Sequence, residues 1–485
     1  MATIADLCAT ATAADAGHLV TTVPLPRYAR AFTKPAANRI VHLGVGGFHR
    51  AHQALYTHWL AEASGQLDWS ICGVGLTEHD RRMQHVLSKQ HGCYTLISRG
   101  PRAHFIDSFL PFKPVVKMEA SRNSFEDARL VGSITEYILA VDDKQPAIDA
   151  ISDPLTKIVS LTVTEAGYYL GTDQKLNVTH PMIETDLRTL AGNPKGNLTT
   201  TIGLIVAALE QRRQLNRDGL TILTCDNMPE NGRRLARAVT DFVGALGKTD
   251  LQDYIDQYCS FPSSMVDSIT PYSSSRLVDH VKDHYNVIDE WPIACETFHD
   301  WVIEDRFLAG RPNWEKVGVK FVDDVTPYEL MKLRLLNGAH SCLAYVASLI
   351  GHTTIDAAVN DALIGRYVAG YMSEMRAAVP PVPGVDLANY CRILMERFAN
   401  AAISDQVRYL NGTGEHSEPF EIVDPKKTVL IPLAQTAFMK RDLHEFMRVA
   451  LPELCAETKF PAKINAWYRM IIEKDTKQAL EILLN

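Results

Sequence analysis

The sequence lacks the features that mark several large classes of protein. It contains no run of about 18 consecutive apolar residues, so we expect no membrane-spanning helix. Residues 1–23 have neither a basic start nor an apolar core, which argues against a secretion signal. The nine cysteines form no CxxC pair, which argues against structural zinc and a disulfide framework. These absences predict a reduced, cytoplasmic protein.

The sequence also lacks a large excess of charge of either sign. The net charge is −8 over 485 residues, which gives no reason to expect a nucleic-acid or membrane partner. No internal repeat or low-complexity tract is present, so a purely structural or interaction protein has little support. A chain of this length exceeds one compact core and suits two domains.

A short apolar strand that runs into a glycine-rich turn is the first chemical signal. Residues 39–44 form a short apolar run that includes β-branched residues, and a helix is predicted from Ala51 to Ala63. Strand, glycine turn and helix are the context of a dinucleotide-binding fingerprint, in which backbone N–H groups of Gly46 and Gly47 meet a pyrophosphate. His49 replaces the third glycine, and a lone GxG also occurs in ordinary tight turns. The candidate NAD-binding stretch comprises Val41, His42, Leu43, Gly44, Val45, Gly46, Gly47, Phe48, His49 and Arg50.

A carboxylate follows the next predicted strand, at residues 69–76. Asp80 at this position is suited to accept hydrogen bonds from ribose hydroxyls and to repel a 2′-phosphate, which favours NAD over NADP. Arg81 and Arg82 argue the other way, because arginines can hold that phosphate. All three could also be solvated charges at the start of a helix.

Further strands and helices alternate through the first half. Strands are predicted at 130–134, 158–164 and 220–225, and helices at 201–213 and 232–246. Alternation of this kind predicts an α/β fold with a parallel, doubly wound, Rossmann-like sheet. Ligands bind at the carboxyl ends of such strands, where Thr164–Glu165, Asp226–Asn227 and the Gly44 turn fall.

The second half is predicted to be mainly helical. From about Pro292 the glycine and strand signals thin out, and amphipathic stretches take over. We therefore place a Rossmann-like NAD-binding domain at residues 1–295 and a helical catalytic and substrate domain at 296–485. The amphipathic stretches are 328–349, 357–377, 387–402, 442–457 and 462–484.

Four polar side chains share one sector of the first of these helices. At about 100° per residue and with Lys332 at zero, Glu329 lies near 60°, His340 near 80° and Asn337 near 140°. A desolvated lysine has a lowered pKa and can act as a general base toward an alcohol, while an amide and an imidazole can steady the alkoxide. The alternative is a lysine that reaches solvent, a capping glutamate and a core histidine.

The chain resembles the mannitol dehydrogenase family, the long-chain polyol-specific dehydrogenases. The resemblance spans most of the sequence from Ile40 to about Gln406. The segments that carry it are His42 to His52, Trp69 to Leu76, Ser160 to Gly167, Cys225 to Gly232, Ser264 to Pro271, Trp301 to Asp305 and Tyr328 to His340.

The resemblance implies a role for each matching residue. The family's catalytic signature, a lysine followed by asparagine and histidine, falls on Lys332, Asn337 and His340. It implies that Lys332 is the general base, that the other two bind the reacting oxygen and that Glu329 relays the proton. It also implies that Asn227 and Asp267 bind sugar hydroxyls. In addition, it implies that the Asp80 carboxylate selects NAD. Without the resemblance, Asn227 reads as a turn former and Asp267 as a cap.

The implied reaction is metal-independent hydride transfer between NAD and a polyol/ketose pair, with D-mannitol and D-fructose as the first expectation. The alternatives within the family are arabinitol dehydrogenase and hexuronate reductase. The expected partner is a small-molecule substrate, with a monomer or homodimer as the assembly.

Two segments depart from the family pattern. Extra residues lie between Gly100 and Glu126, which we interpret as a surface loop or an unspliced segment. After Gln406, the family's substrate-clamping arginine and lysine have no counterpart, and Arg408 has the wrong offset from Asp405. This loss leaves open a different class, a non-catalytic NAD-binding protein.

Overall fold

The computed structural model describes residues 2–7, 36–101, 116–119, 124–171, 173–192, 197–340, 343–344, 347, 351–403 and 405–407. The chain divides into two compact units, Met1–Val325 and Thr326–Asn485. The helices predicted at 442–457 and 462–484 lie outside the described residues.

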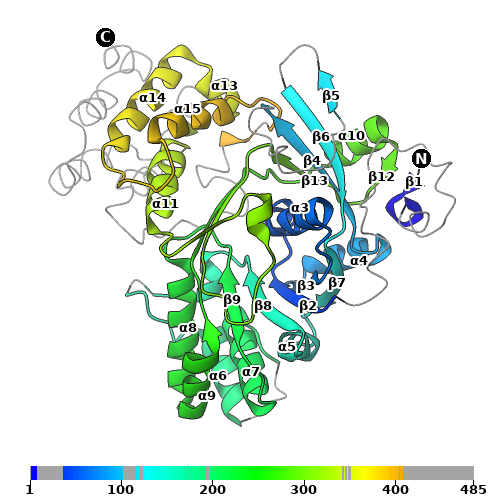
Figure 1. Cartoon of the computed structure of the whole chain (residues 1–485), viewed down its shortest axis with the longest axis vertical. Helices are drawn as coiled ribbons and strands as arrows, with labels where there is room; N and C mark the ends of the chain where they lie inside the picture. The colour runs from blue at the N-terminus through cyan, green and yellow to red at the C-terminus, as the bar shows by residue number, and fades with distance from the viewer. Residues whose placement is uncertain are drawn as a thin grey trace. The chain divides into compact units, whose positions relative to one another are not determined.

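A six-stranded parallel sheet forms the centre of the first unit (Figure 1). Its order is β10-β9-β8-β2-β3-β7, so the chain winds outward from β2 in one direction and from β8 in the other. This is the doubly wound arrangement, and the order reverses between β2 and β8. The strands are β2 (Asn38–Leu43), β3 (Trp69–Gly75), β7 (Ile134–Leu139), β8 (Thr156–Leu161), β9 (Leu220–Thr224) and β10 (Cys259–Ser260).

Both faces of this sheet are covered, which explains the near-continuous apolar runs in the sequence. Successive side chains of a strand point to opposite faces. In β2, Val41 and Leu43 join a core with helices α5 to α9, while Ile40 joins a second core with α3 and α4. The helices are α3 (Gln53–Ser64), α4 (Asp80–Lys89), α5 (Gln145–Ser152), α6 (Pro181–Gly192), α7 (Thr201–Gln214), α8 (Asn231–Leu246) and α9 (Thr249–Tyr258).

The strand predicted at 130–134 is wrong, because two strands meet there. Leu130 and Val131 end β6 (Ser124–Val131), and β7 begins at Ile134 after a break at Gly132 and Ser133. Strand β6 belongs to a separate sheet of order β13-β4-β6-β5, with β4 (Tyr94–Gly100), β5 (Val116–Glu119) and β13 (Ile293–Glu296). Strand β5 pairs antiparallel with β6, so part of the extra segment between Gly100 and Glu126 forms an edge strand.

Short strands continue where the sequence shows little strand signal. Strand β14 (Asp300–Glu304) pairs antiparallel with β11 (Ser264–Asp267) and parallel with β15 (Lys320–Val322). Buried strands of three to five residues lack the alternation that reveals longer strands. The first unit also contains β1 (Ala2–Thr3), β12 (Val287–Ile288), α2 (Gly47–Ala51), α10 (Ser275–Tyr285) and the 3₁₀ turns η2 (Glu165–Tyr168) and η3 (Trp314–Val317). The boundary at 295/296 stays a prediction.

The second unit is helical over its described residues. Its elements are α11 (Thr326–Met331), the π-helix η4 (Lys332–Asn337), α13 (Ile355–Val359), α14 (Ala362–Arg376) and α15 (Leu387–Phe398). The single helix predicted at 357–377 is wrong. Asp361 interrupts it, because its Oδ1 accepts hydrogen bonds from the N–H groups of Leu363 (2.9 Å) and Ile364 (3.3 Å) and so starts a new helix.

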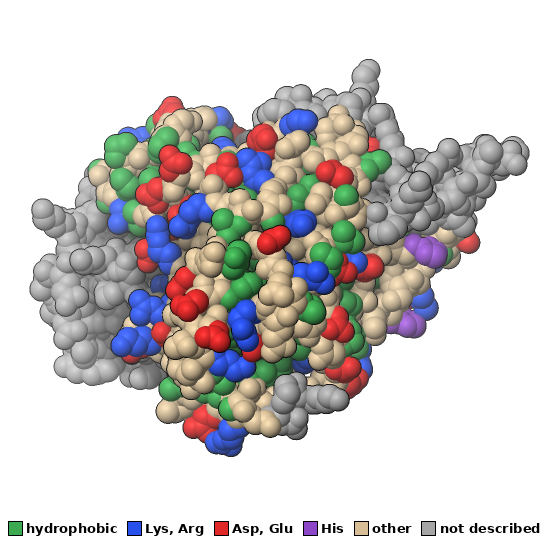
Figure 2. All heavy atoms as spheres, turned by 60° about the horizontal axis from the view of Figure 1, so that its bottom comes forward, with side chains coloured by type: hydrophobic (Ala, Val, Ile, Leu, Met, Phe, Trp, Pro, Cys, Tyr) green, Lys and Arg blue, Asp and Glu red, His purple; other side chains and the backbone are tan. Residues whose placement is uncertain are grey.

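No helix among the described residues is long and apolar enough to cross a bilayer. On the face shown in Figure 2, basic and acidic side chains of the described residues are interspersed. That face therefore lacks the single-sign stripe typical of nucleic-acid binding.

Candidate active site

The turn after β2 is held in a conformation that requires glycine at its first position. Gly44 has φ +88°, and a Cβ there would lie 2.3 Å from the Thr162 carbonyl oxygen. The Gly44 carbonyl accepts hydrogen bonds from the Gly46 N–H (2.9 Å) and the Thr162 hydroxyl (2.7 Å). A Cβ on Gly46, by contrast, would meet nothing within 4 Å. The turn is therefore packed on one side and open above Gly46, which fits the approach of a phosphate to its main chain.

Most side chains of the candidate NAD-binding stretch point into the protein. Binding by this stretch therefore depends on its main chain, as the glycine pattern predicts. His42 is held by Ser160 Oγ (2.8 Å) and Thr162 Oγ1 (3.0 Å), and its ring stacks on His49 at 3.4 Å. The buried members are Val41, His42, Leu43, Val45, His49 and Arg50.

Two alanine substitutions separate these two sides of the turn. Gly44→Ala is expected to lower the free energy of unfolding by more than about 1–2 kcal/mol, because left-handed strain adds to the clash. Gly46→Ala is expected to leave it unchanged but to weaken NADH binding roughly tenfold, since the added methyl enters the open space. Urea unfolding and NADH fluorescence titration measure the two effects. Equal NADH affinity in Gly46→Ala and wild type would contradict a phosphate at this turn.

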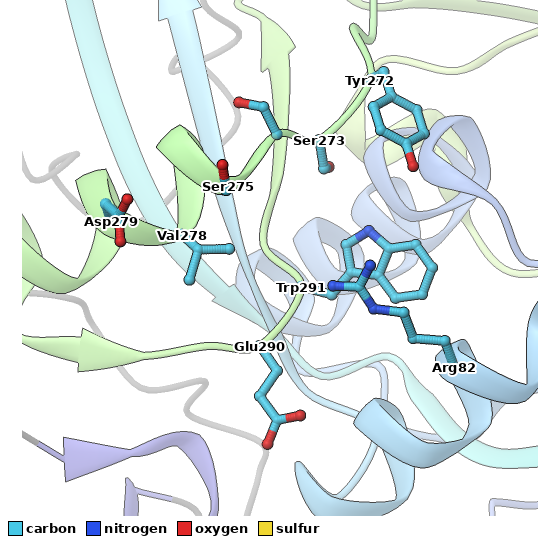
Figure 3. Close-up of a pocket in the computed structure, with 9 residues that line it drawn as sticks. Arg82, Tyr272, Ser273, Ser275, Val278, Asp279, Glu290 and Trp291 are labelled. Carbon is cyan, nitrogen blue, oxygen red and sulfur yellow. The ribbon is translucent and has the colours of Figure 1, made fainter. Parts of the chain in front are cut away.

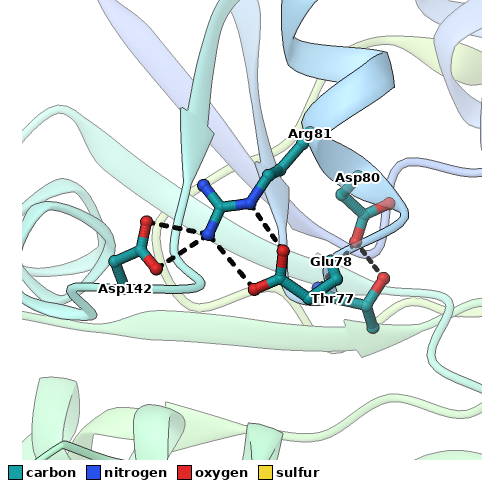
Figure 4. Close-up of polar contacts among 5 residues, drawn as sticks. All are labelled: Thr77, Glu78, Asp80, Arg81 and Asp142. Carbon is teal, nitrogen blue, oxygen red and sulfur yellow. Dashed lines mark hydrogen bonds and ion pairs between the residues drawn. The ribbon is translucent and has the colours of Figure 1, made fainter.

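Asp80 lies at the carboxyl end of β3 and organises the turn that leads into α4 (Figure 4). Its Oδ2 accepts hydrogen bonds from the N–H groups of Leu76 (2.9 Å) and Thr77 (2.8 Å) and from the Thr77 hydroxyl (2.9 Å). These three hydrogen bonds all end on Oδ2 and fix the orientation of the carboxylate, including that of Oδ1. This arrangement suits a fixed acceptor for ribose hydroxyls.

The two neighbouring arginines are both engaged elsewhere. The Arg81 guanidinium bridges Glu78 (2.6 Å) and Asp142 (2.7 Å), as Figure 4 shows. The Arg82 guanidinium lies over the Trp291 ring at 4.4 Å. Both arginines would have to leave these partners to bind a 2′-phosphate, so the structure favours NAD.

Arg82 also lines a pocket of about 500 Å³, shown in Figure 3. The pocket lies between α4, the start of α10 and Trp291, and none of the predicted site residues lines it. Its walls are Arg82, Tyr272, Ser273, Ser274, Ser275, Val278, Asp279, Glu290 and Trp291.

The carboxyl ends of β8 and β9 are tied together by Asp226. Its carboxylate accepts hydrogen bonds from the Thr164 N–H (2.8 Å) and the Tyr168 hydroxyl (2.7 Å). Burial raises the pKa of Asp226, although these hydrogen bonds act in the opposite direction. Because β9, β8 and β2 are neighbours, the three predicted strand ends do meet at one edge of the sheet.

The two predicted sugar-binding residues lie on different elements of the first unit. Asn227 is exposed in the loop after β9, whereas Asp267 is buried at the end of β11. Asn231 joins these elements, because its side-chain amide donates to the carbonyls of Asp226 (2.9 Å) and Ser264 (2.8 Å). Asp267 is paired in register with Asp300, whose carboxylate is 2.8 Å from Lys320 Nζ.

The predicted catalytic residues all lie on one continuous helical segment of the second unit. Glu329, Lys332 and His340 are at most 9% exposed. Their spacing differs from the 100° expectation, because residues Lys332–Asn337 form a π-helix with i→i+5 hydrogen bonding. In such a turn residue i+5 lies above residue i, so Asn337 comes closer to Lys332 than the predicted 140°. The π turn therefore gathers the signature more tightly on one face.

His340 lies next to two residues that are distant in sequence. Its ring stacks on Phe398 at 4.9 Å with an interplanar angle of 20°. Its Nε2 lies 3.4 Å from Asp405 Oδ2. The Asp405 backbone is fixed in turn, because its carbonyl accepts the Ile355 N–H (3.0 Å). These two neighbours could not be predicted from the sequence, since no periodic or motif signal connects Phe398 or Asp405 with His340.

Fold, glycine turn and polar helix together define a dinucleotide-dependent dehydrogenase. The sequence model of the mannitol dehydrogenase Rossmann domain matches residues 38–316, and that of the mannitol dehydrogenase C-terminal domain matches residues 324–429. The chain therefore belongs to the mannitol dehydrogenase family of NAD-dependent polyol dehydrogenases. The predictions of family, fold class, cofactor and enzyme class are confirmed.

Individual relatives agree with this assignment. Mannitol dehydrogenase 2 of Saccharomyces cerevisiae is 34% identical over 512 residues, covering 96% of this chain and 95% of the relative. Mannitol 2-dehydrogenase of Aspergillus clavatus is 36% identical over 400 residues, covering 81% of this chain and 74% of the relative. The solved ternary complex of Pseudomonas fluorescens mannitol 2-dehydrogenase with NAD and D-mannitol is 34% identical, with a TM-score of 0.73 and coverage of 95% and 88%.

The yeast alignment also bears on the departures from the family pattern. It spans 512 positions, more than the 485 residues of this chain, so the yeast protein contains residues that this chain lacks. Where those residues fall, and whether they include the segment after Gln406, stays a prediction.

Proposed function

We propose that this protein interconverts D-mannitol and D-fructose with NAD(H), using a lysine as general base and no metal ion. The observation that carries the proposal is the polar face of one helical segment, on which Glu329, Lys332 and His340 are buried and Asn337 is half-buried. The mannitol 2-dehydrogenase relatives support the substrate pair. The same helix would serve a pentitol or hexuronate substrate, which are the alternatives.

Each residue on this helix has a separate task in the proposed reaction. In the oxidation direction, Lys332 removes the proton of the hydroxyl at the reacting carbon. Asn337 and His340 donate hydrogen bonds to that oxygen and stabilise the negative charge that develops on it. Glu329 passes the proton from Lys332 toward solvent. Phe398 keeps the His340 ring in place by stacking on it.

Residues of the first unit bind the remaining groups. The main chain of the Gly44–Gly47 turn holds the pyrophosphate, and Asp80 holds the adenosine ribose. Asn227 and Asp267 bind hydroxyls of the sugar away from the reacting carbon. When bound, NAD accepts the hydride from that carbon. Lys332, Asn337 and His340 supply the charge stabilisation at the oxygen, so the proposed reaction needs no metal.

We also propose a cytoplasmic location and a monomer or homodimer as the working assembly. The described cysteines are all free thiols: Cys72, Cys93, Cys225, Cys259, Cys295 and Cys391. Free thiols persist in reducing compartments, which supports the first part of this proposal.

The assay that tests the function follows oxidation of the reduced cofactor. Purified full-length chain is mixed with NADH and D-fructose, with xylulose or a keto-uronate as alternative substrates, and with NADPH in place of NADH. We expect D-fructose to give the highest kcat/KM, NADH to be strongly preferred, and EDTA to leave the rate unchanged. If another ketose is turned over faster, that ketose replaces D-fructose as the proposed substrate. Loss of activity with EDTA would contradict the metal-free mechanism.

One outcome of this assay leads to a second candidate function. The loss of the family's substrate-clamping residues that the sequence predicts after Gln406 favours an inactive NAD-binding protein. If the folded chain binds NADH but reduces none of these substrates, that second candidate replaces the first.

A further inference from the structure

The π turn that carries Lys332 changes which backbone groups are paired. In an α-helix the Gly338 N–H would donate to the Arg334 carbonyl, four residues earlier. Here the Gly338 N–H donates to the Leu333 carbonyl, five residues earlier, and to the Leu335 carbonyl, three residues earlier, but not to the Arg334 carbonyl. The Arg334 carbonyl has a different partner, the Tyr371 hydroxyl of α14, at 3.1 Å. A side chain from a neighbouring helix thus takes the place of the α-helical donor.

Tyr371 lies so close to the turn that position 338 must be a glycine. A Cβ on Gly338 would lie 2.1 Å from the Tyr371 hydroxyl oxygen and 3.1 Å from Cζ. Tyr371 is only 4% exposed, so the ring has little room to move away. The Arg334 guanidinium adds a second link to the same region, because it donates to the Ala378 carbonyl just after α14. Gly338, Arg334 and Tyr371 therefore form one interlocked contact.

We propose that Tyr371 is a positioning residue that keeps Lys332–Asn337 in the π register and so aligns Lys332 with Asn337 and His340. Without the hydroxyl, the Arg334 carbonyl loses its partner and the Gly338 N–H becomes its natural replacement. That exchange returns the turn to the α register and rotates the residues after it by about 100° relative to Lys332. The catalytic consequence rests on the proposed function, whereas the structural consequence does not.

The first test is Tyr371→Phe, which removes the hydroxyl and keeps the ring. We expect backbone amides in a peptide covering residues 332–340 to exchange hydrogen at least several-fold faster by mass spectrometry. We expect kcat for D-fructose reduction to fall roughly 10- to 100-fold, a loss of about 1.4–2.7 kcal/mol in transition-state stabilisation. The Kd for NADH should change less than twofold, since the residues proposed to bind the cofactor belong to the first unit and are not moved.

Tyr254→Phe is the matched control. The Tyr254 hydroxyl on α9 also donates to an arginine carbonyl, that of Arg217, at 3.1 Å, and the ring is also buried. Its loss removes the same chemical interaction far from the polar helix in sequence. This variant should leave both kcat and the exchange of residues 332–340 at wild-type values.

A second pair of variants tests the contact itself. Gly338→Ala places a methyl group against the Tyr371 hydroxyl and should lower both the melting temperature and kcat. Adding Tyr371→Phe removes the atom at 2.1 Å, so the double variant should recover part of both losses. Two additive losses would mean that the residues do not interlock.

The outcomes separate the inference from the proposed function. If Tyr371→Phe changes neither exchange nor kcat, the inference is wrong. If exchange rises while kcat of an active enzyme is unchanged, Tyr371 does not position the base. If the wild-type chain has no ketose reductase activity, the proposed function fails, and the exchange and rescue experiments still decide whether Tyr371 holds the turn.

Discussion

Replacing Lys332 by alanine is expected to lower kcat by about 10²- to 10⁴-fold, the range that a positioned general base contributes. The loss should persist at every pH, because it follows from the missing amine and not from a change in its protonation state. The Kd for NADH should stay within twofold of wild type, since the residues proposed to bind the cofactor belong to the first unit. Stopped-flow reduction of D-fructose and NADH titration measure the two quantities.

Two further measurements make this result specific to proton transfer. Lys316→Met removes an exposed lysine of η3 and should leave kcat unchanged. Small primary amines added to Lys332→Ala should restore part of the rate, because they enter the vacated volume and accept the proton. Near-normal activity of Lys332→Ala without amine would show that another residue is the base.

Acidification is expected to destabilise the first unit well above the pH at which carboxylates titrate. Burial lowers the pKa of His42 and His58 from 6.5 to about 3, and burial next to His42 lowers the pKa of His49 as well. Below pH 6.5 these histidines therefore bind protons in the unfolded chain but stay neutral in the folded chain. The stabilisation is complete above pH 6.5 and is lost as the pH falls from 6.5 toward 3.

The expected loss in the free energy of unfolding is large for so small a change of pH. Each buried histidine contributes about 1.4 kcal/mol per pH unit, so the loss between pH 6.5 and pH 5 is about 2 kcal/mol per residue. Urea unfolding at pH 7.5, 6.5, 5.5 and 5.0 measures it. In the His58→Gln variant, the free energy of unfolding should depend less steeply on pH, by the contribution of one histidine, about 1.4 kcal/mol per pH unit.

The Glu126 carboxylate acts in a separate, more acidic range. Burial raises the pKa of Glu126, but the hydrogen bond from His280 and the Arg99 charge outweigh it and lower the pKa from 4.5 to about 2. Its contribution is present above pH 4.5 and is lost only below that value. A free energy of unfolding that stays constant between pH 6.5 and pH 5 would therefore contradict the buried-histidine account.

The parts of the fold that could be predicted from sequence are those with a strong local signal. The apolar run before Gly44 and the glycine pattern together predict a buried strand and a turn, and both are present. Buried parallel strands need apolar residues on both faces, which makes them visible as continuous runs. The short strands β13 to β15 offer no such run, and the pattern around Leu130 and Ile134 merges two strands into one.

The candidate site shows the same division. Residues on one helix could be grouped from spacing alone, which is how Lys332, Asn337 and His340 were found. Spacing could not reveal the π turn, because periodicity analysis assumes 3.6 residues per turn throughout. Nor could it connect Tyr371 or Asp405 with that helix, since both contacts are made across distant segments.

The π turn also determines how this segment tolerates insertions and deletions. A π turn is an α-helix with one residue added, and here the added residue lies between Lys332 and Asn337. Residues four apart share a face in an α-helix, so a helix without the extra residue would present the same side chains with a spacing shorter by one. Deleting one residue between Lys332 and Asn337 would thus preserve their alignment, whereas the same deletion after Asn337 would turn His340 away. A sequence search for this chemistry in other dehydrogenases should therefore allow both spacings.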